Sequence, residues 1–300
     1  MAIVKISDNK GNISIMLCLL FTALLGFTAY VIDIGLIYAE KTKLSNALDS
    51  AVLAAILELP DNDEKAKAVA ADYLEKNNVD QNDTIITIGT DRKSIQIKGV
   101  KRVKHFFSPI IKINSSDVNV TAKAVIGSAK SVKGGIRPFA VEKFDYSYGS
   151  LVTLKMAAGD GYKGNYGAVA LGGTGANVFL ENTLYGYNGI ISVGDAVYTE
   201  TGNMAGAAND IKKYINTECS TFDDFMRDSI RLWTVPLVDT LQVEGTSPVT
   251  VVGFGEFFVE NITNNSGKIE VIGRFVRYVT NAYIDTTLED TGVYGAKLVK

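Results

Sequence analysis

The chain is poor in the residues from which disulfide frameworks, metal centres and most hydrolytic sites are built. Its 300 residues include two cysteines and a single histidine, His105. A zinc site takes three or four protein ligands, and a triad-type nucleophile needs a histidine beside it. His105 lies among lysines and arginine, without the sequence context of a nucleophile. We therefore expect His105 to be an exposed polar residue, and we predict no catalytic residue, no metal ligand, no cofactor and no enzymatic activity.

The net charge of the chain is also small. The formal charge is −3, so the composition implies no nucleic-acid partner. The two cysteines are not expected to pair, because Cys18 stands in a long uncharged run and Cys219 in a polar segment. The 28 glycines crowd into the second half of the chain, a distribution typical of turns between strands.

One long uncharged run is present, from residue 13 to residue 32, and it ends at Asp33. A helix needs about 20 apolar residues to cross the hydrocarbon core of a membrane. We favour a retained single-pass anchor in the cell membrane. The alternatives are a cleaved signal peptide, whose apolar core is usually about 7–15 residues long, and a buried helix of a soluble protein.

The flanking charges barely decide the orientation of this anchor. Lys5 and Lys10 precede the run, and Lys41 and Lys43 follow it. Basic residues near the membrane ends favour the cytoplasmic side, whereas long domains are translocated largely regardless of charge. We expect the N-terminal stub, residues 1–12, to be cytoplasmic and the remainder to be extracytoplasmic.

The apolar periodicity predicts that the membrane helix continues to about residue 58. Apolar residues spaced by three and four continue beyond Asp33, and Pro60 ends the pattern. A second helix is predicted over residues 61–77, with Asp61 or Asp63 as its cap. Strands are predicted over residues 84–89, 94–99 and 118–126, with a short helix over residues 103–111.

The second half predicts a β-rich region. Residues 128–135 have the composition of a linker, and short glycine-punctuated strands follow. Helices are predicted over residues 205–216 and 222–232, and a strand pair over residues 249–262 and 268–280 with a turn between them. The expected fold class is α+β, with a membrane helix (13–32), a small α+β domain (59–127) and a β-rich, glycine-rich domain (136–300).

Three segments resemble functional motifs without completing them. The glycine-rich stretch 172–175 lacks the Lys-Ser/Thr pair of a phosphate loop, and we interpret it as a plain loop. Residues 145–150 nearly form a metal-binding Asp-x-Ser-x-Ser motif, but the second serine is one residue late. Asp160 and Asn165 supply too few oxygen ligands for calcium. The basic stretch 93–112 is favoured as a solvated face over a site for anionic lipid or cell-wall polymer.

A fairly specific pattern follows the apolar run. It consists of Asp-x-Gly-x-x-Tyr, a basic residue, Leu-x-Asn-Ala-x-Asp and an alanine-rich stretch, carried here by Asp33, Gly35, Tyr38, Leu44, Asn46, Ala47, Asp49, Ala51 and Ala54. This pattern resembles the N-terminal segment of TadG-like proteins of the Flp (tight adherence, Tad) pilus system. Residues 105–108 and 120–124 look like the end of their first domain. The stretches 164–167, 193–195 and 201–203 are similar to the glycine-rich outer region of some of them.

The resemblance implies a single-pass, non-enzymatic structural or accessory component of Tad-type pilus assembly, with a pilin-like fold for the small α+β domain. Its partners would be the lipid bilayer and other Tad membrane proteins or pilin, with self-association also open. Small residues such as Gly26 permit close helix packing in lipid. Pilins cut by prepilin peptidase usually carry a glutamate where this chain has Met16, counting from Gly11, so we predict an uncleaved anchor. The alternative is a membrane-anchored surface adhesion or binding protein that shares the anchor.

Overall fold

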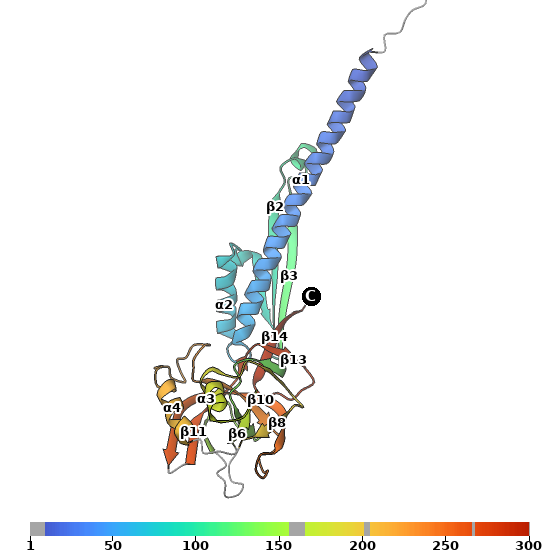
Figure 1. Cartoon of the computed structure of the whole chain (residues 1–300). Helices are drawn as coiled ribbons and strands as arrows, with labels where there is room; N and C mark the ends of the chain where they lie inside the picture. The colour runs from blue at the N-terminus through green and yellow to red at the C-terminus, as the bar shows by residue number, and fades with distance from the viewer. Residues whose placement is uncertain (1–9, 156–165, 201–204, 266–267, 300) are drawn as a thin grey trace, which may run out of the picture.

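The computed structural model describes residues 10–155, 166–200, 205–265 and 268–299. One long helix, α1 (Lys10–Ala55), rises from a two-part body (Figure 1). A single 3-10 turn, Ile56–Glu58, follows α1 and leads into Leu59 and Pro60. The prediction of one helix from the apolar run to about residue 58 is confirmed. The part of the body that surrounds the end of α1 is called the proximal body (residues 33–135 and 278–299), and the other part the distal body (residues 136–277).

The second helix, α2 (Asp63–Lys76), lies beside the C-terminal half of α1 (Figure 1). Its cap is Asn62, whose side-chain oxygen accepts a hydrogen bond from the Lys65 backbone N–H. The prediction that Asp61 or Asp63 caps this helix is therefore wrong. Asn62 has the extended backbone that an N-cap requires, and Asp63 instead supplies a negative charge in the first turn, where the helix dipole favours it.

The proximal body contains a mixed sheet that covers α1 on the side away from α2. Its strand order is β1 (Thr84–Ile88), β2 (Ser94–Lys104), β3 (Ser115–Lys133), β14 (Val293–Val299) and β12 (Tyr278–Val279). Two short strands, β7 (Ile190–Ser192) and β13 (Ala282–Ile284), also pair with β3. The C-terminal strands thus return to the sheet formed by residues 84–133, and the division of the chain into domains stays a prediction.

Some local predictions are wrong. The short helix predicted over residues 103–111 is limited to a 3-10 helix at Ser108–Ile111, because Pro109 is tolerated only at a helix start, and residues 103–104 instead end β2. Of the linker predicted over residues 128–135, residues 128–133 continue β3. The strand ends at Gly134 and Gly135, which both have positive φ. Residues 222–231 form turns and irregular chain rather than a helix, with strand β9 beginning at Leu232.

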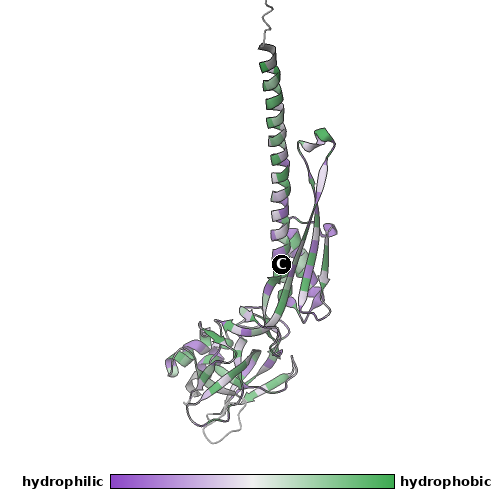
Figure 2. Cartoon of the chain, turned by 90° about the vertical axis from the view of Figure 1, so that its right-hand side faces the viewer, coloured by the Kyte–Doolittle hydropathy of each residue, from purple (hydrophilic) through white to green (hydrophobic). Residues whose placement is uncertain are grey.

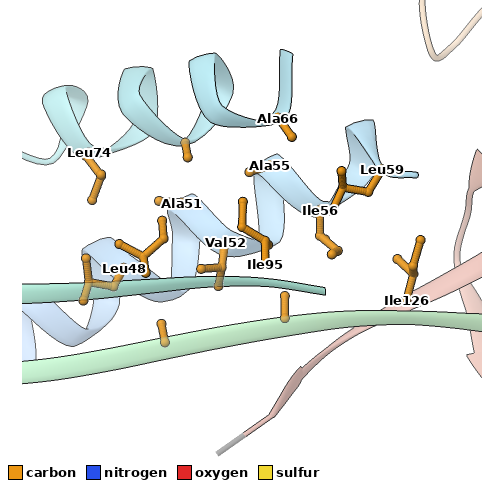
Figure 3. Packing of buried hydrophobic residues seen from close by; sticks show 14 of the residues in the cluster. Leu48, Ala51, Val52, Ala55, Ile56, Leu59, Ala66, Leu74, Ile95 and Ile126 are labelled. Carbon is orange, nitrogen blue, oxygen red and sulfur yellow. The ribbon is translucent and has the colours of Figure 1, made fainter. Parts of the chain in front are cut away.

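The core of the proximal body forms where α1 is held between α2 and the sheet. Figure 3 shows Ala51 and Ala55 on the side of α1 that faces α2. Gly99 on β2 lies so close to α1 that an added Cβ would stand 3.1 Å from Leu48 Cδ1. The buried cluster comprises residues 44, 48, 51, 52, 55, 56, 59, 66, 70, 74, 95, 97, 122, 124, 126, 279 and 294. Small residues therefore set a close approach of α1 to its neighbours.

The distal body is built on a second sheet with strand order β5 (Leu151–Lys155), β11 (Lys268–Val276), β10 (Pro248–Asn265), β8 (Ala196–Thr199), β6 (Tyr166–Ala170), β4 (Phe139–Glu142) and β9 (Leu232–Val238). Because β9 also pairs with β10, five of these strands close into a ring. The predicted pair of long strands is confirmed as β10 and β11, while residues 266–267 of their turn lie outside the described residues.

Two helices pack on this sheet. The prediction of α4 (Ala205–Ile215) is confirmed, whereas α3 (Ala176–Tyr185) was not predicted. The segment that forms α3 begins after a glycine-rich loop, and polar and β-branched residues reduce its helix propensity. Packing holds it in place: Phe179 meets the Phe139 ring edge-on at 5.2 Å between centroids, and Phe139 stacks on Trp233.

The two bodies are joined by the pairing of β7 with β3, by a buried apolar cluster to which both contribute, and by polar contacts. Arg227 Nη1 donates to the Leu57 carbonyl at 3.1 Å, and Arg277 pairs with Asp61 at 3.1 Å. The Tyr146 hydroxyl donates to the carbonyl of Thr291 at 3.1 Å. These contacts attach the distal body to the end of the helix that carries the anchor.

Candidate functional site

The N-terminal half of α1 presents apolar side chains to its surroundings on every face. Side chains from Ile13 to Ile32 are exposed, apart from a partly buried Ala29, and an 18-residue window of this helix has mean hydropathy 2.4. Twenty helical residues span about 30 Å, the thickness of the hydrocarbon core. By its length and composition this helix can therefore cross a membrane. Its exposure contradicts the alternative of a helix buried in a soluble protein.

Both threonines inside the apolar run make hydrogen bonds within the helix. The Thr22 hydroxyl donates to the Cys18 carbonyl at 2.8 Å, and the Thr28 hydroxyl donates to the Leu24 carbonyl at 2.9 Å. A hydroxyl without a partner would be unfavourable in hydrocarbon. These bonds make both threonines compatible with lipid.

The first carboxylate after the apolar run is buried by contact with a segment more than 70 residues away. Asp33 accepts backbone N–H bonds from Phe106 at 2.8 Å, from Phe107 at 3.2 and 3.3 Å, and from Ser108 at 2.7 Å. The Ser108 hydroxyl also donates to Asp33 Oδ2, at 2.5 Å. Asp33 thereby binds the tip of the β2–β3 hairpin to α1 at the end of the apolar run.

These bonds control the ionisation of Asp33. Its burial, at 2% exposure, opposes the charged form and would raise its pKa. The Ser108 hydroxyl and the three backbone N–H groups outweigh that effect and lower the pKa from 3.8 to about 2. The carboxylate is therefore charged at neutral pH and serves as the acceptor that the hairpin tip requires.

Replacing Asp33 by asparagine is expected to loosen the hairpin tip. The amide keeps one acceptor oxygen, and its NH₂ group faces backbone donors. Amide exchange at residues 106–108 should become about tenfold faster or more. Hydrogen-exchange mass spectrometry in detergent measures this, with Asp49→Asn on the same helix as control. Unchanged exchange in the Asp33 variant would contradict the assignment.

The same contact has a predicted pH dependence. Because the folded-state pKa of Asp33 is lowered, its stabilising effect is complete above the ordinary value near 4 and is lost as the pH falls toward about 2. The wild-type tip should be protected at pH 5, exchange faster below pH 4 after correction for intrinsic rates, and match the Asp33 variant near pH 2.

A second carboxylate links α1 to β2 two turns further along. Glu40 pairs with Lys101 and with Lys43, each at 2.7 Å. The hydrogen bond from Lys101, followed by that from Lys43, lowers the pKa of Glu40 from 4.5 to about 2. Lys101 therefore belongs to this contact and not to an entirely solvated basic face.

The pattern residues identified in the sequence fall into three structural groups. Asp33, Leu44, Ala47 and Ala51 are buried and hold α1 against the proximal body. Asp49 and Ala54 are partly buried. The remaining four, Gly26, Gly35, Tyr38 and Asn46, are exposed, so their packing role stays a prediction that needs a partner outside this chain.

The described residues contain no group of three or more His, Cys, Asp and Glu side chains that could hold a metal ion. His105 is partly buried rather than exposed as predicted, with Nδ1 3.3 Å from the Ile113 carbonyl oxygen. Asp160 and Asn165 lie outside the described residues. The Gly175 N–H, at the start of α3, donates to the Glu200 carboxylate at 2.6 Å, which supports the interpretation of residues 172–175 as a plain loop.

Taken together, an exposed apolar helix that continues into the core of an α+β body indicates a protein that is anchored in a membrane near its N-terminus. Residues 11–71 match the family model Tad, described as "Putative Flp pilus-assembly TadE/G-like". The matched segment comprises nearly all of α1 and more than half of α2, and it confirms the resemblance to TadG-like proteins. No curated protein and no solved structure matched the chain.

Proposed function

We propose that the chain is a single-pass structural or accessory component of a Tad/Flp-type pilus assembly apparatus, with a cytoplasmic N-terminus and extracytoplasmic proximal and distal bodies. One observation carries the proposal: the match over residues 11–71 covers both the apolar half of α1 and the half that forms the proximal core. The family description names pilus assembly, and no enzymatic step is assigned to this chain.

The proposed mechanism is mechanical. The apolar half of α1 associates with helices of other Tad membrane proteins or with pilin, and the proximal body follows because it is built around the same helix. Cleavage of a signal peptide after the apolar run would cut this continuous helix, which supports a retained anchor. The glycine-rich distal body lies outside the matched segment, so its contact with pilus or surface rests on the resemblance alone.

Affinity recovery tests this proposal. The tagged full-length protein is solubilised in mild detergent from its own cells, and co-purifying proteins are identified by mass spectrometry. Tad platform proteins, the secretion ATPase or pilin are expected. Recovery of the protein alone, or only with surface polymer, would contradict the proposal and favour a surface adhesion protein that shares the anchor.

Replacing Gly26 by leucine is expected to reduce this co-recovery several-fold. An added Cβ at Gly26 meets no atom within 4 Å, so the larger side chain is accommodated in the isolated chain. It would obstruct only a neighbouring helix that approaches closely in the membrane. Thr28→Leu, on the opposite face of α1, is the matched control. Equal recovery of both variants and the wild type would remove Gly26 from the contact surface.

A further inference from the structure

The tip of the β2–β3 hairpin carries an exposed apolar cluster. We call it the apolar tip; it comprises Phe106, Phe107, Ile110, Ile111 and Ile113, which are between 41% and 86% exposed. Turns between strands usually consist of small and polar residues. A contiguous exposed apolar patch indicates contact with a membrane or with another protein.

The position of the apolar tip favours a membrane. Asp33 binds the backbone of residues 106–108, and the apolar run ends one residue before Asp33. If residues 13–32 span the hydrocarbon core, the tip is held where the helix leaves it. Figure 2 shows the tip as a green, hydrophobic end of the hairpin beside α1, pointing in the direction of the N-terminal, apolar part of the helix.

The side chains around the tip suit the boundary between lipid and water. Tyr30 and Tyr38 are exposed on α1 on either side of Asp33, and tyrosine is enriched at membrane interfaces. Lys104 precedes the tip and Lys112 lies between two of its isoleucines; both are exposed, with no ion pair to another described residue. Cationic side chains beside an apolar surface are attracted to anionic headgroups.

From this placement we propose that the apolar tip inserts into the outer leaflet of the membrane that α1 spans, as a second lipid contact of the same chain. This inference rests on the proposed membrane anchoring. The transmembrane helix and the tip contact the membrane at two separate points, and Asp33 connects them. Two points of contact limit rotation and tilting of the proximal body against the membrane surface more than contact through α1 alone.

A fluorescent label tests whether the tip enters lipid. The full chain with Cys18→Ser and Cys219→Ser receives one cysteine at a time, by Ile110→Cys, Leu24→Cys or Glu75→Cys, and each is labelled with the environment-sensitive dye NBD. The proteins are reconstituted into vesicles of phosphatidylcholine and phosphatidylglycerol. Quenching is measured with iodide in the water and with spin-labelled lipid. Leu24 reports the anchor, and Glu75, exposed on α2, reports water.

The dye at position 110 is expected to resemble the dye at position 24. Iodide should quench both several-fold less than the dye at position 75, and spin-labelled lipid should quench both strongly. If position 24 is protected and position 110 is as accessible to iodide as position 75, the tip proposal is overturned while the anchor stands. If position 24 is also accessible to iodide, both the anchor and the tip proposal fail.

Two further measurements identify what covers the tip. Adding Phe106→Ser and Ile111→Ser to the labelled protein should make position 110 several-fold more accessible to iodide. Unchanged protection would show that the dye itself enters the lipid, and the proposal would be overturned. Protection of position 110 in native membranes but not in vesicles of the purified protein would also overturn it, since the tip would then dock on another protein.

Discussion

Replacing Leu48 by alanine is expected to destabilise the proximal body by about 3 kcal/mol, within the usual range for a buried leucine. Leu48 is fully buried on α1, and the backbone of β2 packs directly on its side chain at Gly99. A cavity at this point cannot close easily, because rigid strands and two helices surround it. The effect should be measured as amide exchange of Ile95 and Ile97 in the full chain in detergent, where about 3 kcal/mol corresponds to roughly a hundredfold faster exchange.

Leu53→Ala supplies the matched control for this prediction. Leu53 lies on the same helix five residues later and is 38% exposed. Both substitutions change the helix propensity in the same way, so a difference between their effects on amide exchange results from the burial of Leu48. Equal effects of the two substitutions would show that the second half of α1 is not the core element described here.

Replacing Glu256 by glutamine is expected to stabilise the distal body at alkaline pH. Glu256 on β10 is buried at 3% exposure, and the Thr234 hydroxyl donates to its carboxyl at 2.6 Å. Burial raises its pKa from 4.5 to about 7, although Thr234 and the positive charge of Arg137 act in the opposite direction. The folded state thus retains the proton of Glu256 at a pH where the unfolded chain has lost it.

The sign of the effect follows from this raised pKa. Below pH 4.5 the group contributes no penalty, and stability is lost as the pH rises from about 4.5 to about 7. At about 1.4 kcal/mol per pKa unit, the loss approaches roughly 3 kcal/mol. Glutamine cannot ionise and still offers an oxygen to Thr234, so the variant should lack this loss.

Thermal unfolding between pH 5 and pH 8, followed by Trp233 fluorescence, measures the prediction. Trp233 is buried in the distal body and is the only tryptophan of the chain. Glu244→Gln, at an exposed position in a loop, should keep the pH dependence of the wild type. If the Glu256→Gln variant keeps the same pH dependence of thermal unfolding as the wild type, the buried carboxyl does not titrate in this range.

Much of the fold follows from patterns that are local in the sequence. The spacing of apolar residues by three and four predicts α1 and α2, alternation predicts β1, part of β2 and part of β3, and a turn signal separates the predicted pair β10 and β11. The alternating pattern predicts only residues 118–126 of β3. The second half of this strand contains serine, glycine and lysine, whose place in a strand is set by pairing with β7, β13 and β14. Such pairing between distant segments leaves no local signal.

The candidate site also has one part that local sequence predicts and one part that depends on the tertiary structure. The pattern around Asp33 predicts the anchor and carries the resemblance to TadG-like proteins, but nothing in the spacing predicts that residues 106–108 bind this carboxylate. The hydrophobic residues of the tip are visible in the sequence, where they resemble a short helix. Their exposure, and their position at the end of the apolar run, emerge only when β2 and β3 pair along α1.

The central claim is that one helix both spans the membrane and forms the core of a body on its outer side. The two cysteines test this most directly, since Cys18 lies in the apolar run and Cys219 is exposed in the distal body. Intact cells expressing a Cys18→Ser variant are treated with a charged maleimide that does not cross the cytoplasmic membrane, with Cys219→Ser as the unlabelled control. We predict that Cys219 is labelled in intact cells. Labelling only after the cytoplasmic membrane has been permeabilised would place the body in the cytoplasm and contradict the account.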